Sequence, residues 1–382
     1  MRNGWLASGR SSLLLSLAFI LFFPISVAAQ TWRWTLQDID IEGVGTSITA
    51  DHDGNLHLSY YVPIGGQLRY AFLPAGSSNW YKMTLEGGLN SMDTGITVDS
   101  SGNPYICYTP ASIRYAHWDG KKWSTQEVDP GSGRIAFICS IRVGADGRPM
   151  MAWYLESGTY LRFAILKDGA WFASSIDGGD SLPGKWNSMV LDSQGFPHIS
   201  YSVWPVGELK YARFNGKNWL INLIDTPNLR KYDGGQRSMG NSLVLDPQGN
   251  PIISYYDEES LRVARLVDGR WKQEIVEKLP SFGTMWGWNS FRSTLVLDSK
   301  GHPHVGFQSK LGLEHAWWDG SEWHSQLLVS TIGAPHFENS MAIDQDDNLY
   351  IPFRDPADGS LRMAIGHPVR PSQTASQNDP AS

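Results

Sequence analysis

One pattern recurs along the chain and constrains its fold more than any other feature. A clear copy spans residues 242–255, where an apolar run leads into a turn with glycine and then into a second β-rich run ending in Ser-Tyr. Successive copies lie 45 to 54 residues apart. The aspartate of the turn recurs at Asp51, Asp99, Asp192, Asp246, Asp298 and Asp344, and Gly144 takes its place in the third copy. Seven units of this length indicate a repeat architecture.

Two further patterns complete each unit. A segment of the type Leu-Arg-Tyr-Ala follows every copy, beginning at Leu68, Ile113, Leu161, Leu209, Leu261, Leu313 and Leu361. A tryptophan follows six of these segments, at Trp80, Trp123, Trp171, Trp219, Trp271 and Trp323. Asp-Gly pairs such as residues 168–169 and 268–269 separate the second pattern from the third and are strong hairpin signals. Each unit therefore holds four antiparallel strands, which we name A, B, C and D in chain order.

These units predict an all-β fold, a seven-bladed β-propeller of four-stranded antiparallel blades. The last unit lacks a D strand, and a seventh tryptophan of the D type, Trp34, precedes the first unit. We expect the strand around Trp34 to complete the C-terminal blade, because this pairing closes the ring and hides the edges of an open array. An open solenoid or two separate sandwiches would leave that strand unexplained. The propeller is predicted to span residues 30–366.

Both ends of the chain are expected to lie outside the propeller. Arg2 and Arg10 surround a short basic region, residues 13–23 are an almost unbroken apolar run, and small residues follow at 27–29. This order is typical of a secretory signal peptide, predicted to be residues 1–29 with cleavage near Ala29. The apolar run is too short for a comfortable transmembrane span, so we expect no membrane insertion. Residues 367–382 are polar and are predicted to be a disordered tail.

Composition excludes several classes of partner. The chain has 31 Lys and Arg against 38 Asp and Glu, a formal net charge of −7, and no basic block, so we expect no nucleic-acid partner. Its two cysteines cannot supply a structural zinc site by themselves. Cys107 and Cys139 fall on neighbouring blades, and whether they form a disulfide is left open. We predict no cofactor and expect a monomer, exported either to the periplasm or to the medium.

The turns between strands C and D carry a resemblance to a known family. Residues 118–123 read Trp-Asp-Gly-Lys-Lys-Trp and residues 318–323 read Trp-Asp-Gly-Ser-Glu-Trp. The chain resembles the secreted bacterial propellers of the sialidase-like, Asp-box group, whose Asp-box lies at this turn. The resemblance implies the propeller architecture across all seven units. The leading Ser-x-Asp of the Asp-box, the Phe-Arg-Ile-Pro segment and the arginine triad are not found, so sialidase activity is not implied.

Loop lengths distinguish the two faces of the predicted propeller. The distance from the first residue of the Leu-Arg-Tyr-Ala segment to the following tryptophan is 10 or 12 residues in the six units that have both. The distance from each tryptophan of this type, Trp34 included, to the next turn marker varies from 17 to 27 residues. The A–B and C–D turns therefore form a face of constant length, and the B–C and D–A loops form a variable face. Variable loops on a rigid scaffold commonly carry binding or catalysis, so we place function on the variable face.

The candidate ligand-binding residues come mainly from this face and from its two longest loops, residues 225–237 and 280–292. They are Trp186, Trp204, Arg230, Tyr232, Arg237, Trp286, Trp288, Arg292, His336 and Arg354. Trp186 is expected just before its A strand and Trp204 in a B–C loop. Indole faces stack on sugar rings while arginines and amides bind the hydroxyls, so the predicted ligand is an extracellular glycan. The alternative for each tryptophan is that it packs a loop onto a blade.

Two other functions remain open, and whether the protein is an enzyme is undecided. A glycan-degrading lyase would need a base beside a cation, for which His336, Tyr232, Arg237 and Arg292 supply the residue types. A glycosidase would need two facing carboxylates, for which Asp225, Asp257 and Asp355 are available among several loop acids. The third possibility is a protein-interaction scaffold that presents a flat tryptophan-rich patch.

Repeated positions argue against a metal site. Residues 51–54 and 344–347 hint at calcium loops but coincide with the standard A–B turn, so we predict no metal. His57, His198 and His304 occupy the same place in strand B, which favours a structural role.

Overall fold

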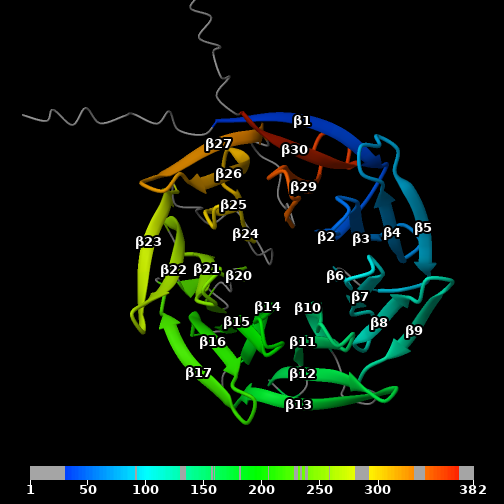
Figure 1. Ribbon diagram of the computed structural model, residues 1–382, viewed down its shortest axis with the longest axis horizontal. Coiled ribbons are helices and arrows are strands. Elements are labelled where there is room, and N and C mark those ends of the chain that lie inside the picture. The colour runs from blue at the N-terminus through cyan, green and yellow to red at the C-terminus, as the bar shows by residue number, and fades with distance from the viewer. Residues whose placement is uncertain are drawn as a thin grey trace, which may run out of the picture.

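The computed structural model is an all-β ring of seven four-stranded antiparallel sheets around a central axis, which confirms the predicted seven-bladed propeller (Figure 1). It describes residues 31–90, 93–129, 135–155, 158, 160–179, 182–204, 206–227, 231–232, 235–236, 240–257, 259–279, 292–330 and 340–369. Among these residues there is no helix, and so none long and apolar enough to cross a membrane.

Strand A of each blade lies innermost and strand D outermost (Figure 1). The strands are, in the order A to D, β2 (Val44–Ala50), β3 (Leu56–Val62), β4 (Gln67–Leu73) and β5 (Tyr81–Glu86) in blade 1; β6 (Thr94–Val98), β7 (Pro104–Tyr108), β8 (Arg114–Trp118) and β9 (Trp123–Glu127) in blade 2; β10 (Ile135–Val143), β11 (Pro149–Leu155), β12 (Tyr160–Lys167) and β13 (Ala170–Gly178) in blade 3; β14 (Leu182–Leu191), β15 (Pro197–Trp204), β16 (Glu208–Phe214) and β17 (Trp219–Asp225) in blade 4; β20 (Ser242–Leu245), β21 (Pro251–Tyr256), β22 (Ser260–Val267) and β23 (Arg270–Lys278) in blade 5; β24 (Thr294–Leu297), β25 (Pro303–Gln308), β26 (Gly312–Trp318) and β27 (Trp323–Ser330) in blade 6; and β28 (Ala342–Ile343), β29 (Leu349–Arg354), β30 (Leu361–Val369) and β1 (Thr31–Asp40) in blade 7. A short hairpin of two strands with two residues each, β18 (Lys231–Tyr232) and β19 (Gly235–Gln236), lies between blades 4 and 5 in the chain.

The N-terminal strand closes the ring as predicted. β1 pairs antiparallel with β30, from Thr31 opposite Val369 to Asp40 opposite Leu361. Trp34 lies across from Gly366, where a Cβ atom would come within 2.7 Å of the indole, so only glycine allows this approach. Strand β30 continues to Val369, three residues beyond the predicted boundary at 366, because β1 offers pairing partners that far.

The tryptophans of the repeat bind each blade to the one before it. Trp123 of blade 2 packs on Tyr70 of blade 1 with ring centroids 5.0 Å apart. The same pairing of a D-strand tryptophan with the ring of the preceding Leu-Arg-Tyr-Ala segment recurs at 5.3 Å for Trp171 with Tyr115, 5.3 Å for Trp219 with Phe163, 5.4 Å for Trp271 with Tyr211, and 5.3 Å for Trp34 with His315. Edge-to-face contacts of this kind stabilise beyond the area they bury. The Leu-Arg-Tyr-Ala segment and the D-strand tryptophan, two of the three repeated patterns, therefore join neighbouring blades.

The arginine of the same segment takes part in a second contact between blades. Asp40, in the D strand of blade 7, accepts hydrogen bonds from the Tyr60 hydroxyl at 2.6 Å and from Arg69 Nη1 at 2.8 Å, both in blade 1. Asp177 of blade 3 is bound in the same way by Tyr201 at 2.7 Å and Lys210 at 3.4 Å of blade 4. These bonds outweigh the burial that opposes them and lower the pKa of Asp40. The role of Asp40 and Asp177 is seen only when one blade is compared with the next, because their partners lie in the next blade.

The A–B turn explains the repeated aspartate and histidine. One oxygen of Asp51 accepts the backbone N–H groups of Asp53 and Asn55, both at 2.9 Å, and the other lies 3.2 Å from His57 Nε2. The second ring nitrogen of His57 lies 2.7 Å from the Tyr70 hydroxyl. His198 makes the corresponding contacts in blade 4. The carboxylate oxygens of this turn are thus used within the fold, and the histidines have structural partners.

Truncation of Trp32 tests the closure. This residue is 5% exposed and lies with its ring centroid 5.1 Å from that of His304 and 5.4 Å from that of His315 in blade 6. Trp32→Ala should lower the free energy of unfolding by about 3–5 kcal/mol, measured by urea denaturation. Leu36→Ala, on the same strand but 49% exposed, is the control and should change it by about 0.5 kcal/mol or less. Equal effects of the two variants would contradict a closure that depends on packing of β1.

The blade 6 histidines predict a loss of stability in mild acid. His315 is fully buried beside His304, and burial, reinforced by His304, holds its pKa well below the usual value. Below about pH 6.5 the unfolded chain binds a proton that the folded chain refuses, so the free energy of unfolding should fall as pH drops, by at most about 1.4 kcal/mol per pH unit.

The variant His315→Tyr, which places there the residue found in blades 1, 2 and 4, should flatten this slope between pH 6.5 and 5 in urea titrations. Exposed His52 is the control position, and His52→Tyr should leave the slope unchanged. A slope that His315→Tyr does not alter would show that His315 is not its source.

Candidate ligand site at the mouth of the central channel

The seven innermost strands surround a narrow channel with hydroxyl groups. Four residues before each A–B turn residue lie Ser47, Gly95, Ser140, Ser188, Ser242, Thr294 and Ser340, and all seven line the channel cavity. Three of these hydroxyls accept the backbone N–H of the next blade, Ser47 from Ile96, Ser188 from Leu243 and Ser242 from Leu295, each at 3.1 Å. The inner edge of the blades would otherwise expose unpaired amides. We call these seven positions the hydroxyl ring. It supports the wall of the channel and makes that wall polar.

Three chemically different side chains meet at the mouth of this channel. Asp93, Trp186 and Arg292 each stand six residues before the turn residue of blades 2, 4 and 6. Arg292 Nη2 forms an ion pair with Asp93 Oδ1, across 199 residues of sequence. The Arg292 guanidinium also lies 4.8 Å from the ring centroid of Trp186. The propeller thus brings an acid, a cation and an indole from three alternate blades to one level of the channel.

Burial makes the Asp93–Arg292 pair electrostatically consequential. The Asp93 side chain is 4% exposed and that of Arg292 15%. Burial raises the pKa of the Asp93 carboxyl, and the positive charge and hydrogen bond of Arg292 oppose that rise. A carboxylate this deep depends on its counter-ion to remain charged.

The backbone at Trp186 is unusual for so large a residue. Its φ is +53°, in the left-handed region that bulky side chains rarely adopt. It lies in β14 where the pairing with β15 shifts register between Lys185 and Ser188. A bulge of this kind redirects a side chain, and such strain gathers at functional sites. The prediction that Trp186 precedes its A strand is wrong, because the bulge lets β14 continue through it to Leu182.

Trp204 extends the same group of side chains. It ends β15, where it pairs with Leu182, so the prediction that it lies in a B–C loop is also wrong. Lys185 Nζ lies 4.6 Å from the Trp204 ring centroid, and Lys185 precedes Trp186 directly. We call Asp93, Lys185, Trp186, Trp204 and Arg292 the mouth cluster. Asp93, Trp186 and Arg292 of this cluster line the channel cavity, and each of its two indoles has a cation beside it.

The cavity below the mouth cluster is small. Its volume is about 150 Å³, and Asp93, Arg142, Trp186, Asn241 and Arg292 line it together with the hydroxyl ring. A space of that size holds a single small molecule or group, not a chain of sugars. The cavity can accept a protruding group of a larger ligand that rests on the mouth cluster.

The other predicted ligand residues are not brought to this site by the described structure. Arg354 is exposed at the end of β29 and does not line the cavity. Arg230, Arg237, Trp286, Trp288 and His336 lie outside the described residues, and of Tyr232 only the backbone, in β18, is described. The sequence analysis missed Asp93 and Lys185. Asp93 could have been found by aligning the seven units at the residue six before the turn.

The loop acids considered for hydrolysis are engaged within their own surroundings. Asp225 accepts the Tyr255 hydroxyl at 2.6 Å, and Asp355 accepts Arg362 Nη1 at 2.7 Å. Asp257 accepts the Glu259 N–H at 2.9 Å and the Ser260 hydroxyl at 2.8 Å. These three side chains therefore have structural partners.

A disulfide joins blades 2 and 3 beside the channel. Cys107 of β7 and Cys139 of β10 are bonded, with Cα atoms 6.2 Å apart. Cys139 lines the cavity. A Cβ atom on Gly95 would lie 2.9 Å from Cys107 Sγ, so this member of the hydroxyl ring is glycine because the disulfide fills its space.

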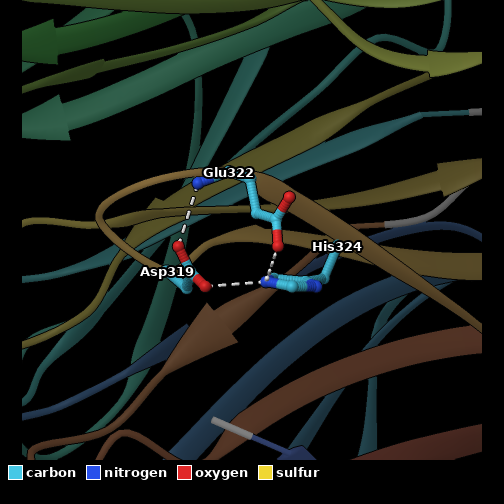
Figure 2. Close-up of side chains that lie close together, drawn as sticks. All are labelled: Asp319, Glu322 and His324. Carbon is cyan, nitrogen blue, oxygen red and sulfur yellow. Dashed lines mark hydrogen bonds and ion pairs between the residues drawn. The ribbon is translucent and has the colours of Figure 1, made fainter. Parts of the chain in front are cut away.

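One trio of side chains in the described part of the chain has the composition of a metal site, and it lies in the C–D turn of blade 6. Figure 2 shows Asp319, Glu322 and His324 around this turn. His324 Nε2 is 2.8 Å from Asp319 Oδ2, and Asp319 Oδ1 accepts the Glu322 N–H at 2.9 Å. Asp119 of blade 2 caps its own C–D turn in the same way without a histidine. The turn geometry accounts for the trio.

A second hollow, of about 420 Å³, lies between blades 1 and 2 beside their A–B and C–D turns. We call it the outer groove, and it is lined by Tyr81, Met83, Trp118, Trp123 and neighbouring residues. Tyr81 is 65% exposed and Met83 45%. The outer groove is a rival to the mouth cluster as a binding surface, since it too presents aromatic faces.

Comparison with known proteins identifies the fold and no family. No protein-family model and no curated protein matches the chain. Among solved structures, an ulvan lyase described as a new polysaccharide lyase family is similar at a TM-score of 0.56 and 13% identity, covering 87% of this chain and 95% of that one. The fucose-specific lectin from Aleuria aurantia is similar at 0.53 and 13%, covering 78% of this chain and 99% of the lectin.

A Hadza microbial sialidase is similar at a TM-score of 0.46 and 12% identity, covering 85% of this chain and 66% of the sialidase. That score is too low to bear on the sialidase-like resemblance. At these identities the likeness to the lyase and the lectin shows a shared fold alone.

Removal of the Arg292 charge tests the mouth geometry. Arg292→Gln leaves the buried Asp93 carboxylate without its counter-ion and should lower the free energy of unfolding by about 3–5 kcal/mol at pH 7, measured by urea denaturation. The double variant Asp93→Asn with Arg292→Gln should recover much of that loss, because neither charge then remains. Arg354→Gln, at an exposed site, serves as the control. If the double variant were no more stable than Arg292→Gln, the coupling would be refuted.

Proposed function

We propose that this protein binds an extracellular glycan on the variable face, with the mouth cluster as the centre of the site. The observation that carries the proposal is a pair of cation–indole contacts that meet at the consecutive residues Lys185 and Trp186. Lys185 Nζ lies 4.6 Å from the Trp204 ring centroid, and the Arg292 guanidinium lies 4.8 Å from that of Trp186. Sugar rings stack their C–H faces on indole, and their hydroxyls accept hydrogen bonds from ammonium and guanidinium groups.

The concave shape of the mouth favours a glycan over a protein partner. A scaffold for proteins would present a flat aromatic patch, whereas here Trp186 borders a cavity of about 150 Å³. The strained backbone at Trp186 supports a binding role, because a tryptophan in the left-handed region costs free energy that packing alone does not require.

Similar structures agree with this class of ligand without deciding it. One neighbour is a fucose-specific lectin and another is an ulvan lyase, so this architecture carries both sugar binding and polysaccharide cleavage. Of the four lyase candidates, Arg292 alone has a described side chain, and no base from the candidate set is described beside it. We therefore propose binding, and the assay below also registers cleavage.

We also propose that the protein acts outside the cytoplasm. The basic, apolar and small-residue order of residues 1–29 supports export through a signal peptide. The Cys107–Cys139 disulfide is consistent with an oxidising compartment.

Affinity electrophoresis through gels containing a panel of neutral and acidic polysaccharides tests this function. At least one polysaccharide should retard the protein, and Trp186→Ala or Trp204→Ala should weaken that retention about tenfold or more, equivalent to about 1.4 kcal/mol. Phe172→Ala is the control, since Phe172 is 59% exposed on the outer strand β13 and away from both hollows.

Trp118→Ala discriminates between the two hollows because Trp118 lines the outer groove. Loss of retention in Trp118→Ala with normal retention in Trp186→Ala would move the site to the outer groove. No retention by any polysaccharide would overturn the proposal. New reducing or unsaturated ends in the same incubations would replace binding by cleavage as the function.

A further inference from the structure

A single charged side chain stands inside the channel below the mouth cluster. Two residues before each A–B turn residue the chain has Thr49, Thr97, Arg142, Val190, Val244, Val296 and Ala342. Six of these are uncharged, and Arg142 alone among them lines the channel cavity. The long arginine side chain reaches a space that the short residues of the other blades do not.

Arg142 has no acidic partner among the described residues. Its one hydrogen bond there runs from Nη1 to the carbonyl oxygen of Ile141 at 2.7 Å. The unit that contains Arg142 is also the one in which Gly144 replaces the turn aspartate, so the repeat carboxylate two residues away is missing. A guanidinium carries five N–H donors and is costly to enclose without a counter-charge. Burial lowers the pKa of Arg142 to about 10, which leaves it protonated at neutral pH.

The hydroxyl groups around the cavity also offer hydrogen-bond donors to an acceptor. Ser47, Ser188 and Ser242 accept backbone N–H groups, which leaves their own O–H hydrogens to point elsewhere. The Ser340 hydroxyl oxygen is buried and has no hydrogen-bond partner in the described structure. Asp93, the acid of the cavity wall, is paired with Arg292. The cavity therefore combines a positive charge and hydroxyl donors with an acid that is already neutralised.

We propose that the central channel binds one oxyanion group, a carboxylate or a sulfate, between Arg142 and the hydroxyl ring. Guanidinium groups bind both of these planar or tetrahedral anions through paired N–H donors. The cavity of about 150 Å³ limits the occupant to a small free anion or to one acidic group that projects from a larger ligand. The site adjoins the mouth cluster, whose Asp93, Trp186 and Arg292 line the same cavity, and it would exist whether or not a glycan binds on the cluster.

Thermal unfolding of the purified protein tests the site with sodium acetate, sodium sulfate and sodium glucuronate at constant ionic strength. A bound anion should raise the unfolding temperature along a saturating curve. In Arg142→Met, which keeps the side-chain length and removes the charge, the saturating rise should disappear, leaving only the general salt effect. Arg354→Gln, at an exposed arginine, and Trp204→Ala, in the mouth cluster but outside the lining of the cavity, should both keep it.

The arms of the experiment identify the source of the anion. A saturating rise with acetate or sulfate assigns the site to free anions, and a rise with glucuronate alone assigns it to the acidic group of a sugar. Equal curves for the native protein and Arg142→Met, or no saturating rise in any salt, would overturn the proposal.

Arg142→Lys covers the case in which Arg142→Met does not fold. This variant keeps the charge but loses the paired N–H donors. Its affinity for the anion should fall at least tenfold, measured by isothermal titration calorimetry with the salt that raised the unfolding temperature. An unchanged affinity in Arg142→Lys would equally refute the assignment. Since Trp204 belongs to the mouth cluster and does not line the cavity, Trp204→Ala reports on glycan retention separately, and failure of glycan retention and failure of the anion site are distinguishable.

Discussion

Closure of the ring by β1 is the constraint on which the rest of the structure depends. Each blade buries its faces against two neighbours, so a missing D strand in blade 7 would leave one interface incomplete and one sheet edge exposed. Thr31 to Asp40 supply that strand, and Trp34 and Trp32 pack into blade 6 as the other repeat tryptophans pack into theirs. The closed ring holds all seven A strands at one radius and one height.

Because the blades are arranged alike around the axis, a given position in the repeat corresponds to a given level along the channel. In the described blades, residues six before the turn, such as Asp93, Trp186 and Arg292, lie at the channel mouth, and the residues four before it form the hydroxyl ring. The residue two before the turn is small or apolar in six blades, which is sufficient to build the wall. Asp93, Trp186, Arg292 and Arg142 depart from this pattern, and each departure places charge or an aromatic face on the axis.

The same contacts that stabilise the fold also position the site. Trp186 is held by a bulge within β14, a strand of the scaffold, and Arg292 is anchored by Asp93 on a distant blade. A site built on strands keeps its geometry better than one built on loops alone. The acids, histidines and turn aspartates of the repeat make hydrogen bonds within and between blades. The charged and aromatic groups that can contact a ligand are therefore concentrated around the channel.

The sequence by itself determined the number of blades, the order of their strands and the closing role of the strand around Trp34, because alternating strands, Asp-Gly turns and spaced tryptophans are local signals that repeat seven times. It also identified Trp186, Trp204 and Arg292 as residues that the repeat does not explain. Only the tertiary structure decided that Trp186 lies in a bulge inside β14, that Arg292 reaches Asp93 across the channel, and that Arg142 stands inside the channel without an acid in the described chain. These are contacts between blades or across the axis. They join residues up to 199 positions apart, and no local pattern in the chain records which of them will face one another.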